Sequence, residues 1–186
     1  MKKSMLLLVL PLLCLTLFPC VSGAIEFDGF GGKVAIVLPE DPWDNAIGFG
    51  VIGSLGSIFP QMTALKAEVG AEYWGNSYGA LGFDTSLSSI SFNGTAKYHF
   101  TNVGMSPFAG GGLGLIFTRS SVSWNTKPEY ALVTDTSDTH LDLGFHLVGG
   151  VDIPIGPGMK FVVEGKYATD GVNTIQLSGG LVVKLK

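Results

Sequence analysis

Cysteine is nearly absent from this sequence, and the little there is lies at one end. Cys14 and Cys20 are its two cysteines, both within the first 20 of 186 residues. A chain from which that segment is removed can form no disulfide framework and no thiolate metal site, and it holds no cysteine nucleophile. Charge is scarce as well, since Asp, Glu, Lys and Arg together make up 14% of the residues.

A hydrophobic run long enough to cross a membrane as a helix is also missing. The apolar stretch from Met5 to Phe18 is shorter than the roughly 20 residues that a spanning helix needs, and Pro11 interrupts it. Lys2 and Lys3 precede this stretch. A positive start followed by a short apolar stretch is typical of a secretory signal peptide.

Small residues at positions 22–24 complete that pattern and provide a cleavage site. The sequence therefore predicts a signal peptide over residues 1–24. The remaining residues, 25–186, are of a length that suits one domain. Export through a cleaved signal peptide predicts a location outside the cytoplasm.

The mature chain lacks the basic surface that nucleic-acid binding requires. Removing Lys2 and Lys3 from the 11 basic residues leaves nine against 15 acidic residues, a net charge of about −6. This balance argues against a nucleic-acid partner. The full sequence is instead rich in glycine, with 27 residues, and its mean hydropathy is +0.40. An exported, glycine-rich and charge-poor chain suits a β-barrel that turns an apolar face to lipid.

Alternation of apolar and polar residues recurs through the mature chain, which indicates β-strands. It is regular in five segments and less regular in three, of which the last is blurred by a glycine run that marks a bulge, a bend or tight packing. The regular segments are 65–73, 90–100, 140–153, 159–167 and 174–185, and the others are 30–38, 46–59 and 108–118. Eight strands, each about long enough to cross a bilayer, predict an all-β, closed, antiparallel transmembrane barrel.

The connections between these segments alternate between long or polar and short. The long set comprises 39–45, 75–86, 119–139 and 169–173, and the short set comprises 60–61, 101–106 and 154–158. Outer-membrane barrels have long extracellular loops and short periplasmic turns, so the pattern predicts the same arrangement here.

The apolar strand faces are predicted to point outward, toward lipid. They carry essentially no titratable side chain, and one charge at the bilayer midplane would cost roughly 2–4 kcal/mol. Aromatic residues near the strand ends are interpreted as interfacial girdles, although strand propensity alone is an alternative explanation. These residues are Tyr98 and Phe100 at one end and Tyr73, Trp74, Phe117 and Tyr167 at the other.

The polar strand faces are predicted to point inward and to fill the barrel with paired charges. An eight-stranded interior is just wide enough to be filled by side chains, and buried charges must be paired there. The predicted polar network of the lumen comprises Lys33, Lys66, Glu68, Glu72, Lys97, His99, His140, Asp142, His146, Asp152, Lys160, Glu164, Lys166 and Lys184.

The chain resembles the small outer-membrane β-barrel superfamily of the OmpA/OmpX kind. The signal peptide, the strand that begins with Pro107-Phe108-Ala109-Gly110 and the last strand carry this resemblance, which extends over the whole mature chain. It implies a Gram-negative outer membrane, with lipopolysaccharide as surrounding lipid and the barrel-assembly machinery as a partner during biogenesis. In the last strand, aliphatic Val183 and Leu185 occupy the places where the family usually has aromatic residues.

The three histidines are the candidate residues for catalysis and for metal binding. Lipid A deacylases are barrels of similar size that use a lipid-facing His/Ser/acid set, and here His99, His140 and His146 all fall on the polar faces. Residues two apart on a strand lie about 6.6–7 Å apart, so His140 and Asp142 would need ligands from neighbouring strands to hold a metal. We therefore expect no enzyme activity, no cofactor and no metal.

The predicted outer loops are acidic. Their carboxylates are Glu40, Asp41, Asp44, Asp84, Glu129, Asp135, Asp138 and Asp170, against the cations Arg119 and Lys127. Trp124 and Tyr130 in the 119–139 loop are the predicted contact residues for a surface partner. The sequence predicts a structural or surface-interaction barrel. A narrow channel for small or apolar solutes, as in OmpW-like barrels, and a lipid A-modifying enzyme remain as alternatives.

Overall fold

The computed structural model describes residues 27–41, 43–59, 61–80, 83–124, 136–169 and 172–185. The predicted signal peptide at 1–24 lies outside these residues. In the described part of the chain, no helix is long and apolar enough to cross a lipid bilayer.

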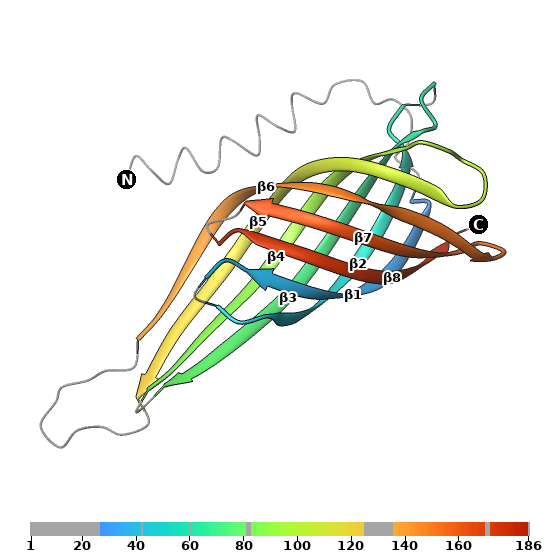
Figure 1. The fold of residues 1–186 in the computed structure, drawn as a ribbon. Coiled ribbons are helices and arrows are strands. Elements are labelled where there is room, and N and C mark those ends of the chain that lie inside the picture. Colours follow the sequence, from blue (N-terminus) through green and yellow to red (C-terminus); the bar gives the residue numbers. More distant parts are fainter. Residues whose placement is uncertain are drawn as a thin grey trace, which may run out of the picture.

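Eight antiparallel strands close into one barrel in the order of the sequence, which confirms the predicted fold (Figure 1). The strands are β1 (Gly29–Pro39), β2 (Ala46–Ser57), β3 (Leu65–Ala80), β4 (Phe83–His99), β5 (Ser106–Trp124), β6 (Thr136–Gly156), β7 (Met159–Thr169) and β8 (Thr174–Lys184). Closure comes from β1 and β8, which pair from Gly29↔Lys184 to Pro39↔Thr174. A closed sheet leaves no strand edge within the barrel wall.

Both ends of the described chain lie at the same end of the barrel, where the backbone N–H of Leu185 donates to the carbonyl of Asp28 at 2.8 Å. We call this the terminal end. It also carries the β2–β3, β4–β5 and β6–β7 connections. The opposite end, called the distal end, carries the other four connections.

The strands differ in length, and this corrects the predicted loops. β3 to β6 have 16 to 21 residues, whereas β1, β2, β7 and β8 have 11 or 12. The predicted loop 75–86 is mostly paired strand, since the register of β3 and β4 continues to Ala80↔Phe83. The predicted loop 119–139 likewise contributes paired residues as far as Val122↔Thr136. Backbone hydrogen bonding continues there although the apolar residues have ended, so four strands project beyond the distal end (Figure 1).

The glycine run in β5 marks tight packing. β5 keeps a continuous register with both neighbours, without a bulge. A Cβ on Gly112 would lie 1.9 Å from the carbonyl oxygen of Gly94 and 2.7 Å from Nε2 of His146, and both distances are shorter than real Cβ atoms allow. Glycine at this inward position therefore lets β5 pack closely against the backbone of β4 and leaves room for the imidazole.

Candidate functional site

Six charged side chains meet inside the barrel in one alternating series, which we call the interior charge chain. Its members come from four strands, and its order is Lys166, Glu72, Lys33, Glu164, Lys97 and Glu68. Lys33 bridges Glu72 at 2.8 Å and Glu164 at 3.0 Å. Strand parity directs each of these residues inward, and barrel curvature brings β1, β3, β4 and β7 within reach of one another.

Burial makes the pairing in this chain obligatory. The side chain of Glu164 is 4% exposed and that of Lys97 is 5% exposed, and the two are joined at 2.6 Å. An unpaired buried charge loses its hydration without compensation. The interior charge chain has three lysines and three glutamates, so its net charge is zero. Each of its lysines has at least one glutamate partner.

A second charged group lies nearer the terminal end. Asp152 on β6 accepts from Lys160 at 2.5 Å and lies 3.2 Å from Nε2 of His99. A layer of buried apolar side chains packs beside the interior charge chain and comprises Ile52, Phe108, Val148, Val162 and Val182. The ammonium of Lys97 lies 4.7 Å from the centre of the Phe108 ring, within the range of a cation–π contact.

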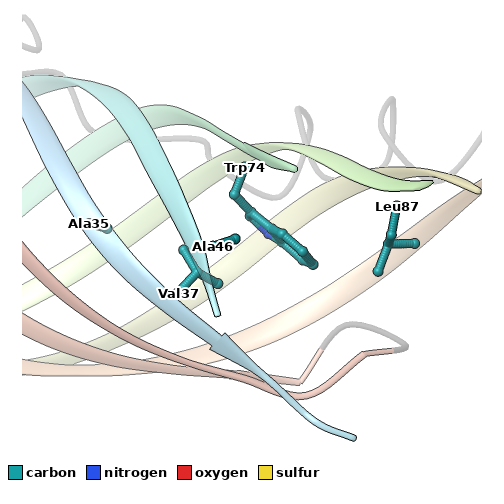
Figure 2. Close-up of a cluster of buried hydrophobic side chains, with 5 residues drawn as sticks. All are labelled: Ala35, Val37, Ala46, Trp74 and Leu87. Carbon is teal, nitrogen blue, oxygen red and sulfur yellow. The ribbon is translucent and has the colours of Figure 1, made fainter. Parts of the chain in front are cut away.

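A second apolar layer closes the interior toward the distal end. Figure 2 shows this cluster, in which the side chains of Val37, Ala46 and Trp74 lie close together inside the barrel. Trp43 and Val172, from the β1–β2 and β7–β8 connections, pack against it. Apolar side chains therefore pack beside the interior charge chain and on its distal side.

Trp74 corrects the predicted aromatic girdle. It points inward and is 5% exposed, whereas its neighbour Tyr73 points outward and is 50% exposed. Successive residues of a strand face opposite sides, so both cannot belong to a lipid-facing girdle.

The space that remains around the interior charge chain is small, whereas a hollow of about 340 Å³ opens beside Lys66, Asp152 and Lys160 at the terminal end. One cavity of about 10 Å³ lies beside Lys33, Glu72 and His146. Another of about 10 Å³ lies between Lys33 and Trp74. A volume of this size holds about one water molecule. Neither cavity provides a continuous passage.

The other residues of the predicted lumen network divide into two groups. His146 is buried and lies 2.8 Å from the hydroxyl of Thr95, while Lys66 and Asp142 are half-buried. His140 and Lys184 were wrongly predicted to lie in the interior. The side chain of His140 is 65% exposed beside Asp138, and that of Lys184 is 66% exposed near Asp28.

Strand length explains both corrections. His140 has the parity of an inward residue, but β6 has already passed the barrel rim at that height. Lys184 is the last residue of β8, at the opposite rim. Thr95 and Phe108 were missed as interior partners because neither is charged and because Phe108 borders the glycine run that obscures the parity of β5.

The predicted loop contacts are only partly within the described residues. Trp124 ends β5, but its side chain lies outside the described part, as does Tyr130. Of the predicted acidic loop residues, Glu129, Asp135 and Asp170 also lie outside it.

The outward faces of all eight strands form an apolar belt. Its side chains are well exposed, as with Val34 (53%), Leu115 (49%) and Leu177 (57%), and no outward position between the two rims carries Asp, Glu, Lys, Arg or His. From Pro107 to Phe117, β5 rises about 33 Å along the strand, or about 25 Å across a membrane at a tilt of about 40°. An apolar band of this height matches the lipid-facing surface of a transmembrane β-barrel.

Comparisons of sequence find no match, whereas comparison with solved structures finds proteins of the same fold. No protein-family model matches the chain, and no curated protein matches it. Neisserial surface protein A superposes with a TM-score of 0.58 at 19% identity, covering 86% of this chain and 96% of that one. A major outer membrane protein from Thermus thermophilus gives 0.60 at 9% identity, covering 84% and 99%.

The attachment invasion locus protein Ail of Yersinia pestis gives a TM-score of 0.55 at 12% identity, covering 86% of this chain and 99% of that one. At these identities the likeness establishes the fold. The chain has the fold of the small eight-stranded outer-membrane barrels, as its resemblance to them predicts.

Proposed function

We propose that this chain is an integral outer-membrane barrel protein with a closed interior and a surface-interaction role. The apolar belt supports placement in a membrane, and the shared fold supports the outer membrane. Residues 1–24 serve as the cleaved signal for export, and residues 25–186 form the barrel domain. The barrel-assembly machinery is its partner during insertion, and lipopolysaccharide is among its surrounding lipids.

The observation that carries the closed interior is the interior charge chain. Its six side chains run across the barrel from β7 through β3 and β1 back to β7, and from there through β4 to β3. An ion that crosses the barrel would have to separate these pairs and displace the apolar side chains that pack around them. Buried pairs are costly to break because each partner is left uncompensated.

The surface-interaction role rests on the projecting part of β3 to β6. β7 pairs with β6 only up to Phe145↔Thr169, and β2 pairs with β3 only up to Gly48↔Trp74. Within the described residues, the backbone of β6 from Ser137 to Gly144 therefore has no strand neighbour on the side away from β5. An open strand edge is a surface on which an extended partner segment can pair.

Membrane insertion is tested on the protein from the outer-membrane fraction. We expect the unboiled chain to migrate as a β-rich species that shifts on boiling, because a closed barrel resists unfolding by detergent. A mature chain that stays monomeric in water without detergent, with the belt residues hidden inside, would contradict the proposal.

The closed interior is tested by conductance across a planar bilayer. We expect no steady ion-sized steps from the purified barrel, and a large porin reconstituted in the same way serves as the positive control, since barrels of 16–18 strands leave an aqueous channel. Steady steps would replace the closed interior with the narrow-channel alternative. Recovery of the protein from the soluble fraction would instead refute membrane insertion itself.

A further inference from the structure

The outer face of the projecting strands changes chemistry from one row of residues to the next. The last row of the apolar belt consists of Tyr73, Ile90, Phe117 and Leu141, which are paired in register across β3, β4, β5 and β6. The next two rows, paired in the same way, are Gly75, Ser88, Arg119 and Thr139, followed by Ser77, Ser86, Ser121 and Ser137. The apolar belt therefore ends abruptly, and a surface rich in hydroxyl groups begins.

A hollow of about 540 Å³ lies at this boundary, over β3, β4 and β5. Tyr73, Gly75, Ser88 and Arg119 are among the residues that line it. A Cβ on Gly75 would lie 3.1 Å from the hydroxyl oxygen of Tyr73, so the tyrosine extends from the belt across the glycine. The absence of a side chain at position 75 deepens the hollow and lets the phenol hydroxyl reach it.

Arg119 gives the hollow its charge. It is the single arginine of the sequence, it is exposed, and within the described part of the chain it makes no ion pair. No carboxylate lines the hollow. Asp84, the one acidic residue on this outer face among the described residues, is paired with Ser123, one row beyond Ser86 and Ser121.

The hydroxyl groups around Arg119 add donors. Ser86 and Ser121 are joined through their Oγ atoms at 2.7 Å, and since such a bond uses one of two hydroxyl hydrogens, the pair retains one donor. Ser88 and Tyr73 add a hydroxyl each, and the guanidinium carries five N–H donors. A site with many donors, one fixed positive charge and no carboxylate is suited to an oxyanion, above all to a phosphate that accepts two parallel bonds from arginine.

The position of the hollow along the barrel axis indicates the source of that phosphate. The hollow begins at the row where the apolar belt ends, which is the level of the headgroups of the surrounding leaflet. It opens on the lipid-facing side of the barrel. We propose that the hollow around Arg119 binds the phosphate group of an outer-leaflet lipid, whose acyl chains lie along the belt below. This inference rests on the proposed insertion in the outer membrane and assigns a lipid site to its distal rim.

Native mass spectrometry of the detergent-solubilised barrel tests the proposal with two lipids of the same acyl chains. We expect phosphatidic acid to be retained and diacylglycerol, which lacks the phosphate, to be lost. Arg119→Gln should weaken retention of phosphatidic acid by about tenfold or more, and Arg119→Lys should restore it only in part, because lysine cannot offer two parallel bonds. Lys184→Gln removes a charge at the terminal end and is the matched control.

A second variant tests shape without changing charge. Gly75→Val places a side chain in the hollow at a strand position that accepts valine, and we expect it also to release phosphatidic acid. Equal retention by wild type, Arg119→Gln and Gly75→Val would overturn the site, as would equal retention of diacylglycerol. Competition by inorganic phosphate at the concentration of the lipid would assign the hollow to free phosphate and overturn the lipid.

Heat modifiability of every variant separates this inference from the proposed function. A variant that still shifts on boiling but no longer binds phosphatidic acid supports the site, because the barrel is intact. If wild type shifts on boiling and binds neither lipid, the site is refuted while membrane insertion stands. If wild type is soluble without detergent, insertion itself is refuted and the lipid site with it.

Discussion

The closed interior and the inner face of the projecting strands share the same alternation of residues, but their charged side chains lie in different environments. In the interior, the side chain of Glu164 is 4% exposed and contacts two lysines. Beyond the rim, Asp138 and His140 form a 3.0 Å pair in which each side chain is 65% exposed. Parity thus decides which face a residue occupies, whereas closure of the barrel decides whether that face is buried. The same substitution should therefore have very different effects in the two regions.

The largest difference is expected for loss of a carboxylate. Glu164→Gln removes the carboxylate that Lys33 and Lys97 share, so one buried positive charge is left uncompensated. We expect the unfolding free energy to fall by about 3–5 kcal/mol. Asp138→Asn removes a carboxylate from an exposed pair, and about 0–1 kcal/mol is expected. Urea unfolding in detergent micelles measures both. Equal losses would mean that the interior is hydrated.

Aromatic side chains of β3 make the same comparison without charge. Trp74→Ala removes the largest member of the distal apolar layer, and about 3–5 kcal/mol should be lost. Tyr78 has the same parity, four residues further along the strand, but is 53% exposed, so Tyr78→Ala should change stability by about 0.5 kcal/mol or less. The unfolding midpoints of the two variants provide the measurement, and a larger effect at Tyr78 would show that the projecting strands are covered.

The outer face gives a smaller difference on one strand. Leu113→Arg places a charge within the apolar belt, and the expected cost is roughly 2–4 kcal/mol. Ser123→Arg adds the same charge on the same face of β5 beyond the belt, where we expect almost no cost. The yield of heat-modifiable barrel and its unfolding midpoint in lipid vesicles report the cost. Similar behaviour of the two variants would exclude lipid around Leu113.

The smallest effect is expected at the terminal rim. Lys184 and Asp28 lie 3.4 Å apart, and the side chain of Lys184 is 66% exposed while that of Asp28 is 35% exposed. Lys184→Gln should therefore cost about 1 kcal/mol or less. Unfolding in 1 M salt should abolish even this difference, since screening shortens the reach of exposed charges to about 3 Å. A cost that persists in 1 M salt would place Lys184 inside the barrel, as the sequence alone predicts.

The number of strands and the side of the barrel wall to which each residue points could be predicted from the sequence, because both depend on the local alternation of apolar and polar residues. The apolar and polar sets around Ile90, Leu143 and Leu177 are on the predicted sides of the wall. Strand length could not be predicted at β3 to β6, because the polar residues of 75–86 and 119–139 have the composition of loops while their backbones remain hydrogen-bonded. The sequence pattern shows where the apolar belt ends, but the strands continue beyond that point.

The ion pairs also could not be predicted. Glu164 and Lys97 lie on β7 and β4, which are not neighbours in the wall, and their contact depends on barrel diameter and stagger. Val182 is an apolar residue on the otherwise polar inner face of β8, and it belongs to the apolar layer that contains Phe108. The parity of Trp74 could have been deduced from that of Tyr73, but the aromatic character of the pair obscured it.

The interior charge chain also bears on how the molecule reaches its membrane. Lys33 lies on the first strand and Glu164 on the seventh, so their contact forms only after β8 has docked between β1 and β7. An open, partly folded sheet would present unpaired ammonium and carboxylate groups to acyl chains. Insertion of the sheet before β1 and β8 pair is therefore unfavourable. We expect insertion and barrel closure to be kinetically coupled, with the docking of β8 as the step after which the barrel is stable in the bilayer.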